Sequence, residues 1–214
     1  MVTRKPRIEI TGFKARHYDR LLDLASAGYY RRFLRRVLDD LAIQPGERIL
    51  DLGAGTGRLA AQMARRTGPA GRVVGVEIGP EMKDRFRRRA ALLPNLTLVE
   101  RRIDAPLDLG ETFDRILISF VMHGLEQHQR ILVIQNASEL LAEDGCLCIL
   151  DWNERDLAAF NPLVRQIFQR FECEQARDFI ARDWRTILAD YRFADFRAWY
   201  YMRGYIRLLT GQKY

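Results

Sequence analysis

The segment from Ile49 to Gly57 constrains the fold of this 214-residue chain more than any other feature. It reads Ile-Leu-Asp-Leu-Gly-Ala-Gly-Thr-Gly, an apolar run that enters a turn with three alternating glycines, and an amphipathic stretch begins at Arg58. Glycine tolerates positive φ and lets the backbone approach a ligand closely. A helix that begins after such a turn offers unpaired N–H groups and a positive dipole end to an anion. The segment therefore predicts a strand, a tight turn and a helix that form an anion-binding site.

Two acidic residues stand after later apolar runs. Glu77 ends the run 72–77, and Asp104 follows the run 96–99. In doubly wound folds, an acidic residue at the end of the second strand hydrogen-bonds the ribose hydroxyls of a nucleoside. Because the carboxyl ends of parallel strands meet at one edge of a sheet, we expect the glycine turn, Glu77 and Asp104 to lie together there.

The rest of the chain continues this alternation. We expect strands over 48–52, 72–77, 96–99, 113–120 and 146–152, with helices over 29–41, 58–66, 81–93 and 127–141 between and before them. Near-continuous apolar strands are typical of a parallel sheet that helices cover on both faces. A loop over 153–161, helices over 162–173 and 183–191, and strands over 193–202 and 205–210 complete the prediction. We see no linker, so we expect one α/β domain.

Asp51 to Gly57, Glu77 and Asp104 together resemble the cofactor-binding motifs of class I S-adenosylmethionine (SAM) methyltransferases. The resemblance covers roughly residues 15–152. It implies a Rossmann-like, seven-stranded, doubly wound sheet with a C-terminal antiparallel hairpin, SAM as cofactor and S-adenosylhomocysteine as product. Residues 1–45 would be an N-terminal helical lid region, 46–152 the SAM-binding core, and 153–214 the substrate-side helices and final hairpin. Tyr18-Asp19 and the segment 119–123 resemble the quinone-biosynthesis C-methyltransferases and relatives that include bacterial phospholipid N-methyltransferases.

The resemblance also implies a set of cofactor-binding residues. They are Tyr18 as a lid residue near the methionine end, Asp51, Gly53, Ala54, Gly55, Gly57, Glu77, Ile78, Ile103, Asp104, Ala105 and Ser119. The rival cofactor is NAD, because Ala60 is an acceptable third position of a dinucleotide-binding glycine motif. Asp51 before the first glycine and Asp104 after the third strand favour SAM over NAD.

The acceptor side of the site is predicted from the residues that follow the fourth and fifth strands. His123 follows the fourth strand and titrates near neutrality, so it is our candidate base and acceptor contact. A structural histidine that caps a helix is the competing interpretation. Tyr30, Phe120 and Trp152 are candidate walls of the acceptor pocket, although packing is an alternative for Tyr30 and Trp152. We identify no set of metal ligands.

Charge and cysteine content suggest where the chain works. The net charge is +7, and arginines gather on the helical faces 31–36 and 87–89. Such faces bind anionic lipid headgroups, or they are simply solvated. Three cysteines in a chain of this length make no disulfide framework. We therefore expect reduced, buried thiols and a cytoplasmic protein that contacts the inner face of the membrane peripherally.

The sequence favours a methyltransferase with a small-molecule acceptor, such as a quinone precursor or an ethanolamine phospholipid. The Asp/Asn-Pro-Pro-aromatic motif of amino-methylating nucleic-acid enzymes is absent after the fourth strand, where 119–122 reads Ser-Phe-Val-Met. Nucleic acid is therefore disfavoured as a partner. A non-catalytic module that binds SAM or its product and an RNA-modifying methyltransferase stay open as alternatives, and the sequence predicts no oligomeric state.

Overall fold

A central parallel strand, β1 (Arg48–Leu52), organises the computed structural model, which describes residues 28–214. Residues 49–52 of this strand are buried, as the apolar run predicts for a strand covered on both faces. It pairs in parallel with β2 (Arg72–Val76) on one side and with β4 (Phe113–Ser119) on the other. The point between β1 and β4 is the topological switch point, because the strand order reverses there.

Seven strands form one sheet in the order β3-β2-β1-β4-β5-β7-β6. The remaining strands are β3 (Leu96–Val99), β5 (Leu141–Trp152), β6 (Phe193–Tyr201) and β7 (Ile206–Lys213). Strand β7 runs antiparallel to both β5 and β6, which makes the C-terminal hairpin. The predicted Rossmann-like, doubly wound sheet with a terminal hairpin is thereby confirmed.

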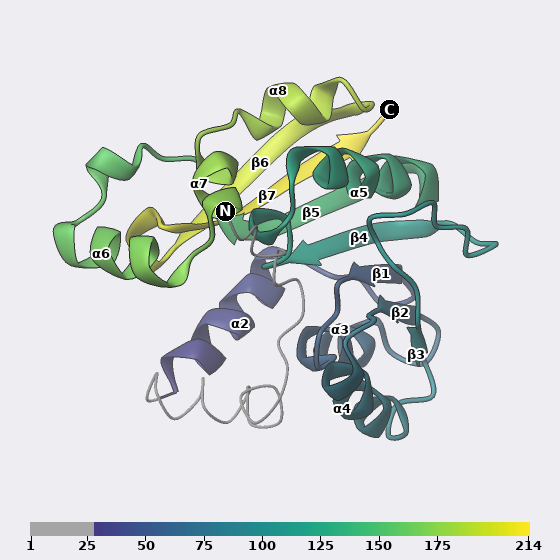
Figure 1. Ribbon diagram of the computed structural model, residues 1–214. Coiled ribbons are helices and arrows are strands. Elements are labelled where there is room, and N and C mark those ends of the chain that lie inside the picture. The colour runs from purple at the N-terminus through teal and green to yellow at the C-terminus, as the bar shows by residue number, and fades with distance from the viewer. Residues whose placement is uncertain (1–27) are drawn as a thin grey trace.

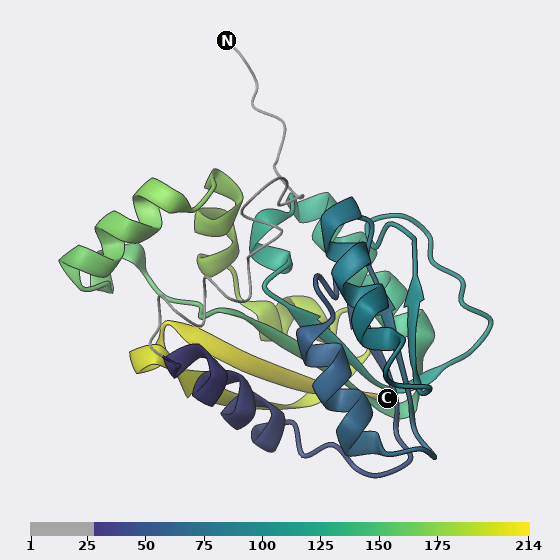
Figure 2. The same ribbon diagram turned by 90° about the horizontal axis from the view of Figure 1, so that it is seen from below.

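Helices cover both faces of the sheet (Figure 1). One layer holds α2 (Tyr29–Asp40), α3 (Arg58–Thr67) and α4 (Pro80–Ala90). The other holds α5 (Gln127–Leu140) and α8 (Trp184–Ala189). Helices α6 (Pro162–Phe171) and α7 (Glu174–Ile180) lie beyond the carboxyl ends of β4 and β5, and α6 stands out from the sheet in Figures 1 and 2. These two helices therefore stand on the edge where the predicted site residues converge.

Helix α7 was not predicted, and the helix expected over 81–93 and the strand expected over 205–210 each differ by three residues at their C-terminal ends. Two further boundaries differ for reasons that the backbone shows. The helix expected over 162–173 ends at Phe171, and a separate helix begins at Glu174 after an extended Glu172. Strand β5 begins at Leu141 rather than at residue 146, because Leu141 already pairs with Phe113 of β4. The register then shifts before Cys146, in the stretch where Asp144 adopts a φ of 60°. In both places a local backbone irregularity, which no periodicity reports, sets the boundary.

The cysteines only partly follow the expectation of buried thiols. All three are free, but only Cys148 is fully buried, whereas Cys146 is half-buried and Cys173 is exposed. Within residues 28–214, no helix is both long enough and apolar enough to cross a membrane.

Candidate active site

The glycine turn connects β1 to α3 at the carboxyl edge of the sheet. Gly53, Gly55 and Gly57 all have positive φ, at 74°, 55° and 72°. A Cβ at Gly53 would lie 2.5 Å from Val121 Cγ2, and one at Gly57 would lie 2.5 Å from Phe86 Cδ2. Gly55 differs, since no atom of the described residues lies within 4 Å of its Cβ position. Two of the glycines thus permit close packing, while Gly55 faces open space.

Glu77, at the end of β2, is hydrogen-bonded to the glycine turn. Its Oε2 accepts the amide of Gly55 at 2.9 Å, and its Oε1 accepts the amides of Ile78 and Gly79 at 2.8 and 2.7 Å. A carboxylate offers about four lone-pair positions, so roughly one acceptor position remains on Glu77. A second hydroxyl would have to displace the Gly55 amide.

Asp51 is buried in β1 directly beneath this turn and is only 1% exposed. Neither carboxyl oxygen accepts a hydrogen bond from any residue in the described part of the chain. Burial, and secondarily the charge of Glu77, raise the pKa of Asp51 to about 7. A buried acid without a donor is costly, and it is stabilised by a cationic or hydrogen-bonding partner.

Asp104 lies in the loop after β3, and the structure shows how that loop is held. Asn136, buried on α5, donates from Nδ2 to the carbonyls of Ile103 and Ala105, at 2.8 Å each. Its Oδ1 accepts the Leu107 amide at 3.2 Å. Burial alone would raise the pKa of Asp104, but hydrogen bonds from Arg102 and Gln129 lower it overall. The carboxylate therefore stays ionised, and Asn136 is a positioning residue that sequence reasoning missed.

The end of β4 carries a strained residue at the same edge. Ser119 pairs with Leu150, and Phe120 follows with a φ of 54°. An aromatic residue in this left-handed region is uncommon and costs about 1–3 kcal/mol, which the surrounding structure must offset. Here the Phe120 amide donates to the carbonyl of Leu150 at 2.8 Å. The backbone is thereby turned so that residues 121–124 pass over the glycine turn.

His123 lies on the short helix η1 (Met122–Gly124) between two carboxylates. Its Nδ1 is 2.7 Å from Asp151 Oδ1, and its Nε2 is 3.7 Å from Glu172 Oε2. Asp151, the next-to-last residue of β5, is 1% exposed and also accepts the His123 amide at 3.2 Å. Burial lowers the pKa of His123, but the two carboxylates outweigh burial and raise it above its usual value. Sequence reasoning found His123 but assigned no role to Asp151 or Glu172.

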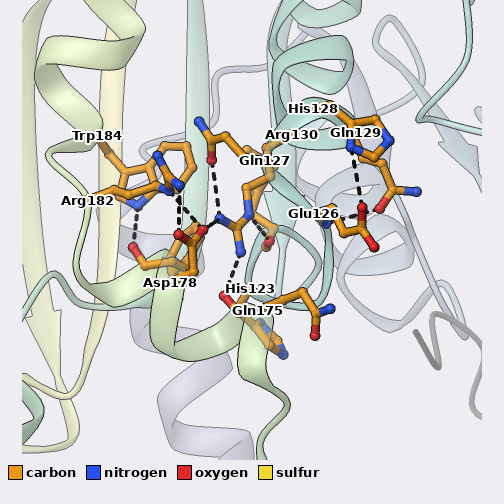
Figure 3. A network of polar contacts seen from close by, with 12 residues as sticks. His123, Glu126, Gln127, His128, Gln129, Arg130, Gln175, Asp178, Arg182 and Trp184 are labelled. Carbon is orange, nitrogen blue, oxygen red and sulfur yellow. Dashed lines mark hydrogen bonds and ion pairs between the residues drawn. The ribbon is translucent and has the colours of Figure 1, made fainter. Parts of the chain in front are cut away.

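A fully buried arginine connects η1 to the outer helices (Figure 3). Arg130 donates from Nε to the carbonyl of Met122 at 2.9 Å and from Nη2 to the carbonyl of Gln175 at 2.6 Å. It also pairs with Asp178 on α7 and lies 5.4 Å from the Phe179 ring centroid. Arg130 thereby fixes α7 against the His123 segment, a role that the polar face of α5 did not predict.

The aromatic candidates are placed in two groups. Tyr30 packs on Phe33 at 5.8 Å and lies under the guanidinium of Arg58, whereas Trp152 meets Phe168 of α6 edge-on at 4.9 Å. Trp152 therefore lies on the same side as His123, and Tyr30 lies on the α2 side of the turn. Tyr18 lies outside the described residues.

The fold and this edge define a class of protein. Residues 49–145 match the family model of a methyltransferase domain. A SAM-dependent methyltransferase from Aquifex aeolicus superposes with a TM-score of 0.64 at 18% identity, over 85% of this chain and 89% of that one. A TehB-like SAM-dependent methyltransferase from Corynebacterium glutamicum gives 0.62 at 20% identity, over 94% and 98%. Residues 49–145 therefore match a methyltransferase domain, and the chain shares the fold of these solved SAM-dependent methyltransferases.

The curated relatives that the sequence matches are methyltransferases of quinone biosynthesis. The ubiquinone/menaquinone biosynthesis C-methyltransferase UbiE of Bordetella parapertussis is 30% identical over 143 residues, which are 65% of this chain and 54% of that protein. The demethylmenaquinone methyltransferase of Symbiobacterium thermophilum is 31% identical over 121 residues, 55% of this chain and 48% of that protein. The chain thus spans about half the length of the curated relatives it matches.

The residues at this edge fit SAM chemically. Asp51 needs a donor, Gly55 has open space at its Cβ position, and Glu77 keeps one free acceptor position. SAM carries an ammonium group and ribose hydroxyls, which are donors of the required kind. The first N–H groups of α3 have no partners within the helix and suit the methionine carboxylate.

Proposed function

We propose that the chain transfers a methyl group from SAM to an amphiphilic small molecule of the quinone-precursor or ethanolamine-phospholipid kind. The observation that carries the proposal is the convergence of Asp51, the glycine turn, Glu77 and Asp104 on one edge, beside a histidine–carboxylate pair. The names of the curated relatives support the quinone class. The division into residues 1–45, 46–152 and 153–214 stays part of this proposal.

The cofactor residues that we propose are those of the carboxyl edge. Glu77 would accept one ribose hydroxyl, Asp51 would face the ammonium group, and Asp104 would accept from the adenine amino group. Ala54, Ile78, Ile103, Ala105 and Ser119 would line the same path, since they neighbour these groups along the chain. Bound SAM supplies an electrophilic methyl group with a good leaving group, so the protein mainly has to align the acceptor and exclude water.

His123 would take the acceptor proton on Nε2. Its Nδ1–H would donate to Asp151, which fixes the tautomer and leaves Nε2, 3.7 Å from Glu172 Oε2, as the basic nitrogen. A positioned base contributes typically 10²–10⁴-fold to the rate. Phe120 and Trp152 would border the acceptor, and the Arg130 network would hold η1 in place while α6 and α7 cover it.

A basic groove supports an anionic membrane as the place where the acceptor is met. It lies between α2, α3 and α4 and has a volume of about 340 Å³. Among the described residues that line it, none is acidic, and five are arginines: Arg31, Arg35, Arg58, Arg65 and Arg89. Leu92, at its rim, is 77% exposed. Arginine recognises phosphate with a planar fork of donors, and exposed apolar side chains enter the headgroup region.

The structure changes which arginines are candidates for this contact. Arg87 pairs with Asp84 at 3.1 Å and also with Glu100, and Arg36 lies over the Tyr201 ring at 5.9 Å. Carboxylates therefore offset the charge of Arg87, and neither Arg87 nor Arg36 lines the groove. Arg65, which the sequence did not single out, replaces them in the groove. We propose a cytoplasmic protein with peripheral membrane contact through this groove.

Flotation with vesicles tests the membrane part alone. We expect the protein to float with phosphatidylglycerol vesicles and not with phosphatidylcholine vesicles. A triple variant with glutamine at Arg31, Arg35 and Arg65 should lose flotation, while glutamine at Arg165, Arg185 and Arg192 removes the same charge elsewhere and should not. Equal flotation of the two triple variants would refute the groove as the contact.

A label-transfer assay tests the activity. Purified protein is incubated with deuteromethyl-SAM and with lipid, polar-metabolite, RNA or protein fractions of a cell extract, followed by mass spectrometry. We expect label in the lipid fraction. Label in polar metabolites would keep the methyltransferase and refute the amphiphile. Label in RNA would favour the RNA-modifying alternative, and bound SAM with no label in any fraction would favour a non-catalytic module.

A further inference from the structure

Two cysteines form a thiol pair on β5, away from the carboxyl edge. Cys146 and Cys148 are two residues apart on one strand, so their side chains share a face of the sheet. Their sulfur atoms lie 3.7 Å apart. Cys146 is half-buried and Cys148 is buried, so Cys146 is the more accessible residue of the two.

The surroundings of the pair are electropositive. Arg115 on β4 donates from Nη1 to Cys148 Sγ at 3.6 Å, and the same guanidinium is held by Glu47 through contacts of 3.0 and 3.1 Å. Arg197 on β6 adds a second positive charge near Cys146. The hydrogen bond with Cys148 and the charge of Arg115 outweigh burial and the charge of Glu47, and lower the pKa of Cys146 to about 7. Thiolates of this kind are nucleophilic at neutral pH.

We propose that Cys146 and Cys148 are a modification site at which peroxides oxidise the two thiols to an intramolecular disulfide. The Cys146 thiolate attacks one peroxide oxygen, the O–O bond breaks, and the departing oxygen leaves as hydroxide or alkoxide and takes up a proton. Cys146 then carries a sulfenic acid. The Cys148 sulfur attacks it, the S–O bond breaks, and the hydroxyl leaves as water with the Cys148 proton.

The strand geometry permits this bond near its limit. Residues i and i+2 of a strand have Cα atoms about 6.6 Å apart, and disulfides accept roughly 4.4–6.8 Å. The sulfurs must approach from 3.7 Å to about 2.0 Å, and the Cβ atoms must come to about 4 Å, closer than an extended strand holds them. The bond therefore requires β5 to shorten locally between residues 146 and 148. A disulfide at this limit is strained, so we expect dithiothreitol to reduce it readily.

The experiment is oxidation of the intact protein by stoichiometric hydrogen peroxide, followed by alkylation and peptide mass spectrometry. We expect a loss of about 2 Da, a disulfide within the peptide that holds residues 146–148, full alkylation of Cys173, and recovery with dithiothreitol. Cys148→Ser should stop at a sulfenic acid on Cys146 that dimedone traps. Cys146→Ser should slow oxidation of Cys148 by at least tenfold, because the accessible thiolate is gone.

Cys173→Ser is the matched control, since Cys173 is exposed and its Sγ lies 3.8 Å from the carbonyl oxygen of His123. It should oxidise at residues 146 and 148 as the wild type does. The proposal is overturned if Cys173 is oxidised while Cys146 and Cys148 stay open to alkylation. It is also overturned if the disulfide joins two chains. Circular dichroism confirms that each serine variant is folded.

Discussion

Asp51 gives the sharpest prediction, because it is a buried acid without a donor among the described residues. Its pKa of about 7, against an ordinary value of 3.8, corresponds to about 4 kcal/mol of preference for the protonated form. The ordinary value applies to the unfolded chain, so ionisation destabilises the free protein increasingly as the pH rises from about 4 to 7. A cationic ligand beside Asp51 would favour the ionised form, so SAM binding should release a proton near neutral pH.

Asp51→Asn keeps the shape of the side chain and removes its titration. In the wild type, only about a tenth of Asp51 is ionised at pH 6, so we expect SAM affinity to be roughly tenfold below its value above pH 8. The ammonium group of SAM also titrates, near pH 8, and it does so with both proteins. The pH dependence of SAM affinity in Asp51→Asn is therefore the baseline from which the contribution of Asp51 is read. The free variant should be more stable than the wild type at pH 8, by up to about 4 kcal/mol, and equal to it near pH 4.

Titration calorimetry in buffers of different ionisation enthalpy measures both the affinity and the released protons. We expect the wild type to release about half a proton more than Asp51→Asn at pH 7. Thermal unfolding at pH 4 and pH 8 measures the stability difference. Identical pH dependence of SAM binding in the two proteins would refute the placement of Asp51 beside the cofactor.

Three further outcomes follow from the site. Gly57→Ala should destabilise the protein by about 2–5 kcal/mol, because a side chain at its positive φ costs about 1–2 kcal/mol and the Cβ would also meet Phe86 at 2.5 Å. Gly55→Ala carries only the backbone cost of about 1–2 kcal/mol and should mainly weaken SAM binding; unfolding and calorimetry separate the two. His123→Gln should lower the plateau rate by about 10²–10⁴-fold. Asp151→Asn should move the acid limb of the pH–rate profile to lower pH, because the charge that raises the His123 pKa is lost. An unmoved limb would exclude the His123–Asp151 pair as the catalytic base. Arg130→Met should destabilise the protein by about 3 kcal/mol. It should also speed amide hydrogen exchange in residues 174–180 more than in the other described residues, because Arg130 bonds the carbonyl of Gln175. An equal increase in exchange throughout the protein would contradict the role of Arg130 in holding α7.

The sequence predicted the sheet and its carboxyl edge because both depend on short-range patterns. Apolar runs identify buried parallel strands, and the glycine turn fixes the first crossover. Once the strands are parallel, Glu77 and Asp104 must lie on the same edge as Asp51. The structure places them there, and their contacts with SAM stay a prediction.

What the sequence could not supply depends on contacts between distant segments. His123 receives its two carboxylates from the end of β5 and from the junction of α6 and α7, which lie 28 and 49 residues away. Arg130 gives no apolar signal, yet it is fully buried because Asp178 and two carbonyls satisfy its donors. The break at Glu172 and the register shift of β5 between Leu141 and Cys146 are local backbone events that no sequence periodicity reports.

The most direct test of the cofactor site is the affinity for S-adenosylhomocysteine of the wild type, Glu77→Gln and Glu100→Gln, measured by titration calorimetry. Glu77→Gln removes the charge that would bind the ribose, and we expect binding to weaken by about 10–100-fold. Glu100, an acid just after β3 that pairs with Lys83 at 2.6 Å, is the matched control and should stay within about twofold of the wild type. Equal affinities of all three proteins, or no binding by the wild type, would contradict the cofactor site at this edge.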